Sequence, residues 1–359
     1  MANEQYIPSY DGTKLFTEAY GDASKPALVL CDGLGCDGFI WQHFLPEFVD
    51  DFYIVHFQYR GHGLSSPPAI KSAMQVSDLR ADLLAVMDHY KLDKATLLGH
   101  SMGVQVILDF GVHHPERVNA LVPMCGSYGH PLDTFHNTDI AGKVLPYLKR
   151  AVGFSPRVAQ ELWSRILTTE LAYQIAVNTE VNGKILRREE FGPYFDRLSA
   201  MDIEVFLGAV TGLGSHSVEM FLPDLNVPTL VVAGQHDTFT PAWLSERMDE
   251  LLPNSELLMI PGGSHVAPIE QPELLHLRFR DFLTKITKTV STKKVSAKKA
   301  KTAGKSKSST KKSEPKKAAK KAAKKNVTKK VAKKSATKKS VKKVAKKKVS
   351  KKAAAVAAV

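Results

Sequence analysis

One short segment of the chain carries a residue pattern that could support nucleophilic chemistry. Residues 99–103 read Gly-His-Ser-Met-Gly, a G-x-S-x-G pentapeptide that follows the apolar run 95–98. On a strand-to-helix turn, the two glycines allow close backbone approach, and the bend lifts the serine side chain above the edge of the sheet. Ser101 is therefore a candidate nucleophile for acyl transfer.

A serine hydroxyl of this kind needs a base to take its proton and an acid to orient the base. Two later loops supply such groups: Asp237 follows the apolar run 227–233, and His265 follows the run 256–260. Because the carboxyl ends of parallel strands meet at one edge of a sheet, we expect both side chains to lie near Ser101.

Other residues compete for these two roles. The pentapeptide alone is weak evidence, since Gly and Ser are common in turns. Asp32 and Asp37 are competing acids, and His62 and His236 are competing bases. We expect His62 to belong to a structural turn in its Arg-Gly-His-Gly loop, and His236 only to adjoin Asp237.

The rest of the chain alternates strand-like and helix-like patterns. A hairpin is predicted over residues 6–21, with Asp11-Gly12 at its turn, and the run 27–31 is apolar throughout, as in strands that are covered on both faces. A helix is predicted near residues 39–49, and residues 76–90 place apolar side chains at helical spacing. This alternation predicts the α/β class, with a mainly parallel central sheet flanked by helices.

The alternation stops at Gly126, and only helical patterns occur before residue 225. The predicted helices of this block are 141–152, 157–168, 171–181, 195–200 and 203–210. We therefore expect a helical cap, inserted at about 127–225 into a domain spanning 1–285, to cover the strand ends at which ligands bind. A closing helix is predicted over 272–285.

Residues from about 6 to 285 resemble the serine α/β-hydrolases, and among them the capped esterases, lactonases and cofactor-free peroxidase-like members. The order Ser, Asp, His along the chain is that of this family and differs from the order in chymotrypsin-like and subtilisin-like proteases. The segments that carry the resemblance are Tyr59-Arg60-Gly61-His62-Gly63-Leu64-Ser65, Gly99–Gly103, Gly234–Asp237 and Gly263–Pro272. Asp32 stands where many relatives have His, and Gln58 stands where many have Asp.

The resemblance implies a role for each matching residue. Ser101 would be the nucleophile, His265 the general base and Asp237 its orienting acid. The backbone N–H groups of Leu34 and Met102 would form the oxyanion hole.

The reaction that follows from these roles is hydrolysis of a carboxylic ester, thioester or lactone through an acyl-enzyme. Substrate contacts are expected from Gly33, His100 and Trp41. We expect no cofactor, and the spacing of the three cysteines suggests no metal site. Peroxidase-like chemistry and carbon–carbon hydrolysis use the same three side chains and remain alternatives.

Charge divides the chain into two parts. The 359 residues carry a net charge of +14, but residues 290–359 hold 28 Lys against the single acid Glu314, whereas residues 1–289 hold 22 Lys and Arg against 35 Asp and Glu. A mildly acidic body therefore carries a strongly basic Lys/Ala-rich tail, 286–359. Like charges repel and nothing apolar packs there, so we expect the tail to be disordered when alone in water.

The tail resembles those of linker histones and bacterial histone-like proteins in composition. That resemblance implies binding to DNA, RNA or another polyanion through phosphate contacts; a solubilising extension without a dedicated partner is the alternative. A rival view of the whole chain is a nucleic-acid-associated protein whose α/β body is a non-catalytic scaffold or ligand-binding module.

The cysteines and the N-terminus predict the compartment. Cys31, Cys36 and Cys125 contain no C-x-x-C pair, which favours a reducing environment over a disulfide framework. Neither a signal peptide nor a run of eighteen apolar residues occurs. We therefore expect a cytoplasmic protein without a membrane span, associated with the nucleoid if the tail binds DNA.

Overall fold

An eight-stranded sheet forms the centre of the computed structural model, which describes residues 2–179, 181 and 188–305. The strands lie in the order β1-β2-β4-β3-β5-β6-β7-β8; β2 is antiparallel to β1 and β4, and the remaining neighbours are parallel. The prediction of a mainly parallel sheet is confirmed. The strands are β1 (Asn3–Pro8), β2 (Lys14–Tyr20), β3 (Ala27–Cys31), β4 (Tyr53–Phe57), β5 (Ala95–His100), β6 (Val118–Met124), β7 (Thr229–Gly234) and β8 (Ser255–Ile260).

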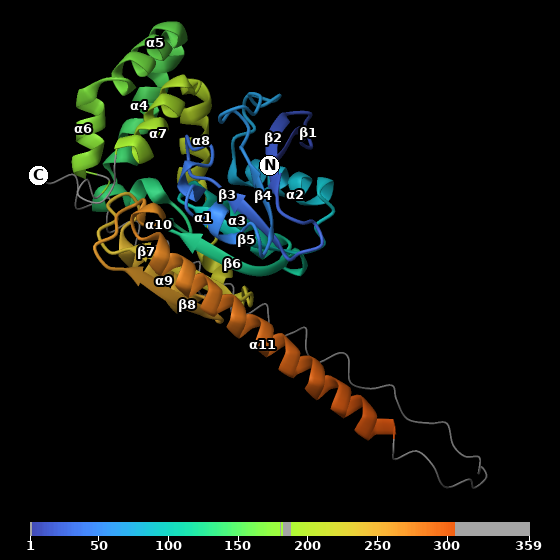
Figure 1. Cartoon of the computed structure of the whole chain (residues 1–359). Helices are drawn as coiled ribbons and strands as arrows, with labels where there is room; N and C mark the ends of the chain where they lie inside the picture. Colours follow the sequence, from blue (N-terminus) through green and yellow to red (C-terminus); the bar gives the residue numbers. More distant parts are fainter. Residues whose placement is uncertain (1, 180, 182–187, 306–359) are drawn as a thin grey trace, which may run out of the picture. The chain divides into compact units, whose positions relative to one another are not determined.

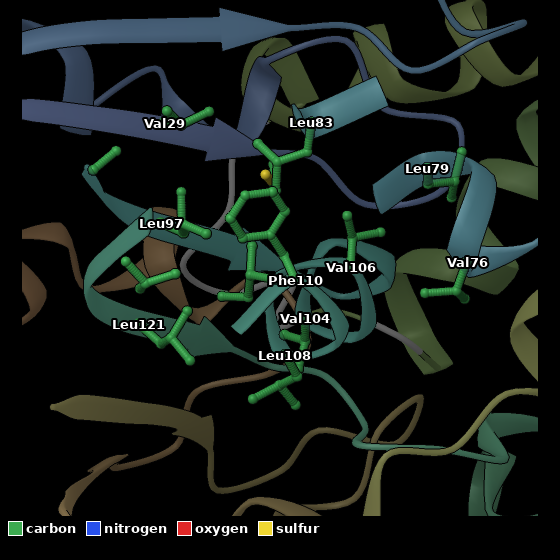
Figure 2. Packing of buried hydrophobic residues seen from close by; sticks show 14 of the residues in the cluster. Val29, Val76, Leu79, Leu83, Leu97, Val104, Val106, Leu108, Phe110 and Leu121 are labelled. Atoms are coloured by element: carbon green, nitrogen blue, oxygen red, sulfur yellow. The ribbon is translucent and has the colours of Figure 1, made fainter. Parts of the chain in front are cut away.

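Helices cover both faces of this sheet, as the alternating pattern predicted. Every residue of β3 and β5 is buried, which explains why β3 is apolar throughout and why β5 carries Leu97 and Leu98 at its centre. Figure 2 shows the packing on one side, where the Phe110 ring of α3 lies toward Leu97 of β5. The α-helices of the sheet domain are α1 (Phe44–Phe48), α2 (Val76–His89), α3 (Met102–His113), α9 (Ala242–Leu251), α10 (Ala267–Glu270) and α11 (Pro272–Lys305).

The segment 39–49, predicted as one helix, contains a short 3-10 helix at Phe39–Trp41 followed by α1. Pro46 explains the division. In a helix that began at Phe39, its missing N–H would interrupt the ladder and its ring would crowd the preceding turn. Within α1, Pro46 lies in the first turn, where an N–H has no intrahelical partner in any case.

Between β6 and β7 the chain forms the helical insertion, defined here as the block from α4 to α8. Each predicted helix is present, but α7 begins seven residues before and α8 ends five residues after its predicted bound; Figure 1 shows the helices grouped together in green to yellow. Val152, Ile203 and Leu207 form a small apolar core inside the insertion, with Trp163 packed against it. The bounds are α4 (Ile140–Phe154), α5 (Pro156–Leu167), α6 (Glu170–Thr179), α7 (Arg188–Ala200) and α8 (Ile203–Ser215).

Short 3-10 helices complete the connections between these elements. They are Pro115–Arg117, Pro131–Asp133, Phe135–Asn137 and Glu219–Asp224.

The C-terminal helix α11 continues to Lys305, twenty residues beyond its predicted end at Lys285. Lys and Ala are good helix formers, and a helix that is already nucleated extends at little cost. Contacts divide the chain into two units, Met1–Ser296 and Ala297–Val359, and the site described below belongs to the first. Residues 306–359 of the basic tail, with the disorder predicted for them, lie outside the described residues.

No single helix in the described part of the chain is long and apolar enough to cross a membrane. By length and composition alone, α7 and α8 pass the same criterion only as a pair, across a bend of 104°.

Candidate active site

Ser101 lies on a strained turn between β5 and α3. Its backbone has φ 52° and ψ −112°, a conformation that costs free energy in a residue with a side chain and is concentrated at functional sites. The Ser101 N–H donates to the Met124 carbonyl at 3.0 Å. A Cβ on Gly103 would collide with the Cys31 carbonyl oxygen, so the helix start can press against β3 only because this position is glycine.

Three side chains predicted to cooperate form a continuous hydrogen-bonded chain. The Ser101 Oγ lies 3.0 Å from the His265 Nε2, and the His265 Nδ1 lies 2.9 Å from the Asp237 Oδ2 and 3.2 Å from its Oδ1. The Asp237 side chain is almost completely buried. An acceptor at Nδ1 selects the tautomer that carries its proton there and leaves the Nε2 lone pair facing the serine hydroxyl.

Thr240 and Phe239, which sequence reasoning missed, complete the surroundings of His265. The Thr240 N–H donates to the Asp237 Oδ1, and its hydroxyl donates to the Oδ2, both at 2.9 Å. The Phe239 ring stacks on the imidazole at a centroid distance of 4.7 Å. The acid is therefore held from two directions, and the base is held against an apolar face.

Glu270 fixes the loop that carries His265. Its carboxylate accepts the Ser264 N–H at 2.7 Å and the Ser264 hydroxyl at 2.6 Å. Glu270 is buried, so these charge-assisted bonds are formed away from solvent. Sequence reasoning assigned no role to this glutamate, although it belongs to the segment that carries the family resemblance.

The loop after β3 packs directly against the serine turn. A Cβ on Gly33 would lie 3.2 Å from the Ser101 Cβ, and Gly33 O accepts the Cys36 N–H at 3.2 Å in a tight turn. Met102 is the first residue of α3, so its N–H has no acceptor inside the helix. Within the described residues, neither Leu34 nor Met102 donates to any of the loop carbonyls.

Asp32 and Trp41 lie behind this loop. The Trp41 indole N–H donates to the Asp32 Oδ1 at 2.7 Å, while the His56 Nε2 lies 2.8 Å from the Oδ2 and its Nδ1 lies 2.9 Å from Glu18. Trp41 was expected to contact substrate. It is fully buried and does not line the cavity described below, because its indole is held by Asp32.

His56 is therefore held between two carboxylates. Burial alone would lower its pKa, but the charges and hydrogen bonds of Asp32 and Glu18 outweigh burial and raise the pKa of His56 to about 10. An imidazolium flanked by two carboxylates consequently underlies the loop at neutral pH.

His100 faces the site from the floor of the serine turn. Its Nε2–H donates to the His265 carbonyl at 2.9 Å, and its Nδ1 is buried without a partner in the structure. Burial and the neighbouring His265 lower the pKa of His100 to about 4. His100 is thus neutral at ordinary pH and presents an acceptor toward Gly33.

The competing acids and bases are engaged elsewhere or turned away from Ser101. Asp32 is bound as described above, and Asp37 forms an ion pair with Arg197 at 2.6 Å. The His62 Nδ1 bonds to the Arg60 carbonyl at 3.1 Å, in the turn where we expected it, and His236 is exposed.

A cavity of about 650 Å³ opens above Ser101, between the sheet domain and the helical insertion. Its wall contains the predicted contacts Gly33 and His100, together with Ser101 and His265. The insertion contributes mainly aliphatic and aromatic side chains, among them Leu145, Leu148, Ile175, Phe191, Phe206 and Leu207. Within the described residues, no Asp, Glu, Lys or Arg lines it.

Within residues 2–179, 181 and 188–305, no group of three or more His, Cys, Asp or Glu side chains could hold a metal ion.

Comparisons with known proteins agree with this geometry. A family model described as alpha/beta hydrolase fold matches residues 26–272. The chain is 26% identical over 256 residues to the 3-oxoadipate enol-lactonase 2 of Acinetobacter baylyi. The aligned region covers 71% of this chain and 87% of that protein. It is 27% identical over 279 residues to the uncharacterized hydrolase YugF of Bacillus subtilis, and the aligned region covers 76% of this chain and 95% of that protein.

Solved structures show the same fold. The enol-lactonase from Burkholderia xenovorans superposes with a TM-score of 0.64 at 20% identity, over 78% of this chain and all of that one. An esterase from Thermogutta terrifontis superposes with a TM-score of 0.63 at 21% identity, over 79% of this chain and 99% of that one.

Proposed function

The chain belongs to the alpha/beta hydrolase fold family, and we propose that it is a serine hydrolase that cleaves a carboxylic ester, thioester or lactone. The observation that carries the proposal is the hydrogen-bonded chain from Ser101 through His265 to Asp237 at the base of an apolar cavity. The lactonase and esterase relatives support hydrolysis as the reaction class.

In the proposed first step, the His265 Nε2 takes the proton of the Ser101 hydroxyl while the Oγ attacks the substrate carbonyl carbon. Asp237 accepts the Nδ1–H bond and stabilises the imidazolium that forms. The 3.0 Å separation of Oγ and Nε2 is short enough for direct proton transfer.

The carbonyl oxygen becomes an oxyanion, which the N–H groups of Leu34 and Met102 would bind. One such donor contributes about 3 kcal/mol to transition-state stabilisation. His265 then gives its proton to the leaving oxygen or sulfur, and the acyl-enzyme forms. A water molecule, activated by the same imidazole, hydrolyses it and restores the serine hydroxyl.

The cavity supports a substrate class. Its wall has no ionised side chain among the described residues, and burying a charged group without a partner is costly. We therefore propose an uncharged ester whose acyl group is apolar. Because the residues around Ser101 and those of the insertion line the same cavity, we also propose that the domain 1–285 is the catalytic unit and that the insertion at about 127–225 acts as its cap.

Hydrolysis of p-nitrophenyl esters by the full chain tests the proposal. We expect turnover that rises with acyl-chain length and falls by at least about 10³-fold in Ser101→Ala and in His265→Ala. Ser127→Ala is the matched control, because Ser127 also lines the cavity but bonds to Gly129 and not to His265. Equal turnover by wild type and Ser101→Ala would overturn the assignment.

We further propose that the Lys/Ala-rich tail binds nucleic acid or another polyanion. Support comes from the sequence, in which 28 Lys oppose one acid over residues 290–359. The cysteines Cys31, Cys36 and Cys125 are free and buried, which supports the reducing, cytoplasmic compartment that we expect for such a partner.

A further inference from the structure

The helical insertion exposes a concentration of large apolar side chains. Of the eighteen exposed large apolar residues in the described part of the chain, ten lie between residues 140 and 175. Scattered exposed apolar residues are ordinary, but a contiguous group marks an interaction surface. We call these ten residues the insertion face: Ile140, Val144, Tyr147, Leu148, Phe154, Val158, Leu162, Ile166, Leu171 and Ile175.

The spacing of these residues places them in stripes along their helices. Val158, Leu162 and Ile166 recur every four residues on α5, while Ala159 and Trp163, one position later, pack on the small core of the insertion. Helical residues four apart share one face. The outer stripe of α5 is therefore apolar in its own right and is not the edge of an internal core.

The insertion face is continuous with the cavity above Ser101. Val144, Leu148 and Ile175 belong to both, since each is exposed and each also lines the cavity. The mouth of the cavity thus opens through the apolar face. A second protein seated there would cover the mouth, whereas a lipid surface could supply an acyl chain to it.

Charge around the face favours an anionic surface. Residues 139–175 contain five Lys and Arg against the three acids Asp139, Glu161 and Glu170, although residues 1–289 as a whole are acidic. Lys143 pairs with Asp139 at 2.7 Å and Arg165 with Glu161 at 2.6 Å, whereas Lys149, Arg150 and Arg157 form no ion pair within the described residues. Apolar stripes bordered by bases are typical of helices that lie on anionic lipid.

We propose that the insertion face docks on an anionic lipid surface and delivers an apolar ester from that surface into the cavity. The docking step stands on the exposed face and its charge. The delivery step rests on the proposed function, because it assumes that Ser101 cleaves the ester.

Binding to vesicles tests the docking step without any turnover. The full chain would be floated with vesicles of phosphatidylcholine alone and with vesicles of equal parts phosphatidylcholine and phosphatidylglycerol. We expect binding to the mixed vesicles and at least about tenfold weaker binding by the double variant Leu162→Glu/Ile166→Glu. Leu277→Glu is the matched control: Leu277 is a helical leucine, 67% exposed, that lies outside the insertion face.

The variant residues do not line the cavity, so hydrolysis of a short soluble ester reports whether the double variant is folded. We expect this activity to be retained, while hydrolysis of a long-chain ester held in the mixed vesicles falls. Ser101→Ala should bind vesicles like wild type, which separates a failure of docking from a failure of the proposed function.

Three results would overturn the docking proposal. The first is no binding of wild type to the mixed vesicles. The second is equal binding by wild type and the double variant, which would assign the attraction to the basic tail alone. The third is a wild-type dimer that the double variant dissociates, which would show that a second copy covers the face.

Discussion

Asp237 is a buried carboxylate that accepts hydrogen bonds from the Thr240 N–H, the Thr240 hydroxyl and the His265 ring. These three hydrogen bonds fix the carboxylate, which in turn holds the imidazole in one tautomer. Its contribution to the proposed reaction is therefore specific to its charge and cannot be supplied by an isosteric amide.

We accordingly expect Asp237→Asn to lower kcat by about 10⁴-fold with little change in KM, because the amide would favour the wrong tautomer of His265. Steady-state kinetics on a short p-nitrophenyl ester measure both constants. Asp37→Asn is the control, since Asp37 pairs with Arg197 outside the chain of hydrogen bonds. Similar losses in the two variants would remove Asp237 from its proposed role.

His56 gives a prediction about stability and pH. Its pKa of about 10 in the folded state lies above the ordinary value of 6.5, so protonation stabilises the fold. That stabilisation is complete below about pH 6.5 and is lost as the pH rises through about 10. Urea unfolding at several pH values should show wild type losing stability over this range relative to His56→Gln. Parallel pH profiles for the two proteins would contradict the paired imidazolium.

Single residues of the site could be predicted only where they stand at the ends of strands. Ser101, Asp237 and His265 each follow an apolar run, so parallel strands bring them to one edge. Thr240 and Glu270 instead form hydrogen bonds to loop residues close to them in sequence, Asp237 and Ser264. These bonds depend on the conformation of each loop, which residue spacing does not reveal. His56 on β4 pairs with Glu18 on β2 and with Asp32 in the loop after β3. No spacing in the sequence predicts these contacts.

At the scale of elements, the serine turn depends on how closely α3 approaches β3. The Cys31 carbonyl oxygen occupies the space that a side chain on Gly103 would need, and β3 also carries the loop that contains Leu34. Turn, strand and loop are therefore a single packed unit, and a shift in one displaces the others.

Replacing Gly103 by alanine should destabilise the protein by about 3 kcal/mol or more, because a Cβ would force backbone away from backbone. Gly153→Ala is the matched control. Gly153 is also helical but has open space around its Cα, so alanine there should be neutral or stabilise by up to about 1 kcal/mol. Chemical denaturation gives both values; equal stability of the two variants would refute the packing argument.

Elements whose ends are set by local chemistry were the hardest to predict. Pro46 divides the segment 39–49, for which a single helix is predicted. The continuation of α11 past Lys285 reflects helix propensity that acts against charge repulsion. The parallel strands were predictable because burial on both faces demands uninterrupted apolar runs.

The whole molecule combines an acidic body with a basic tail. Residues 306–359 carry 22 Lys and one acid, a density of charge suited to counterion release on a polyanion. The tail would then set where the enzyme is concentrated, while the cavity sets what it cleaves.

Deleting residues 306–359 should abolish steeply salt-dependent DNA binding and leave hydrolysis of a soluble ester within about twofold of the full chain. Gel-shift titrations over a series of salt concentrations, with esterase assays on the same preparations, test both expectations. Equal DNA binding by the two forms would show that the tail has no such partner.

Covalent labelling decides whether Ser101 is a nucleophile activated by His265. A fluorophosphonate probe, followed by peptide mass mapping, should modify wild type at Ser101 alone, with Ser127→Ala labelled normally and Ser101→Ala unlabelled. Labelling should also be strongly slowed in His265→Ala, because the hydroxyl would lose its base. No modification of wild type, or equal labelling of Ser101→Ala, would contradict the account.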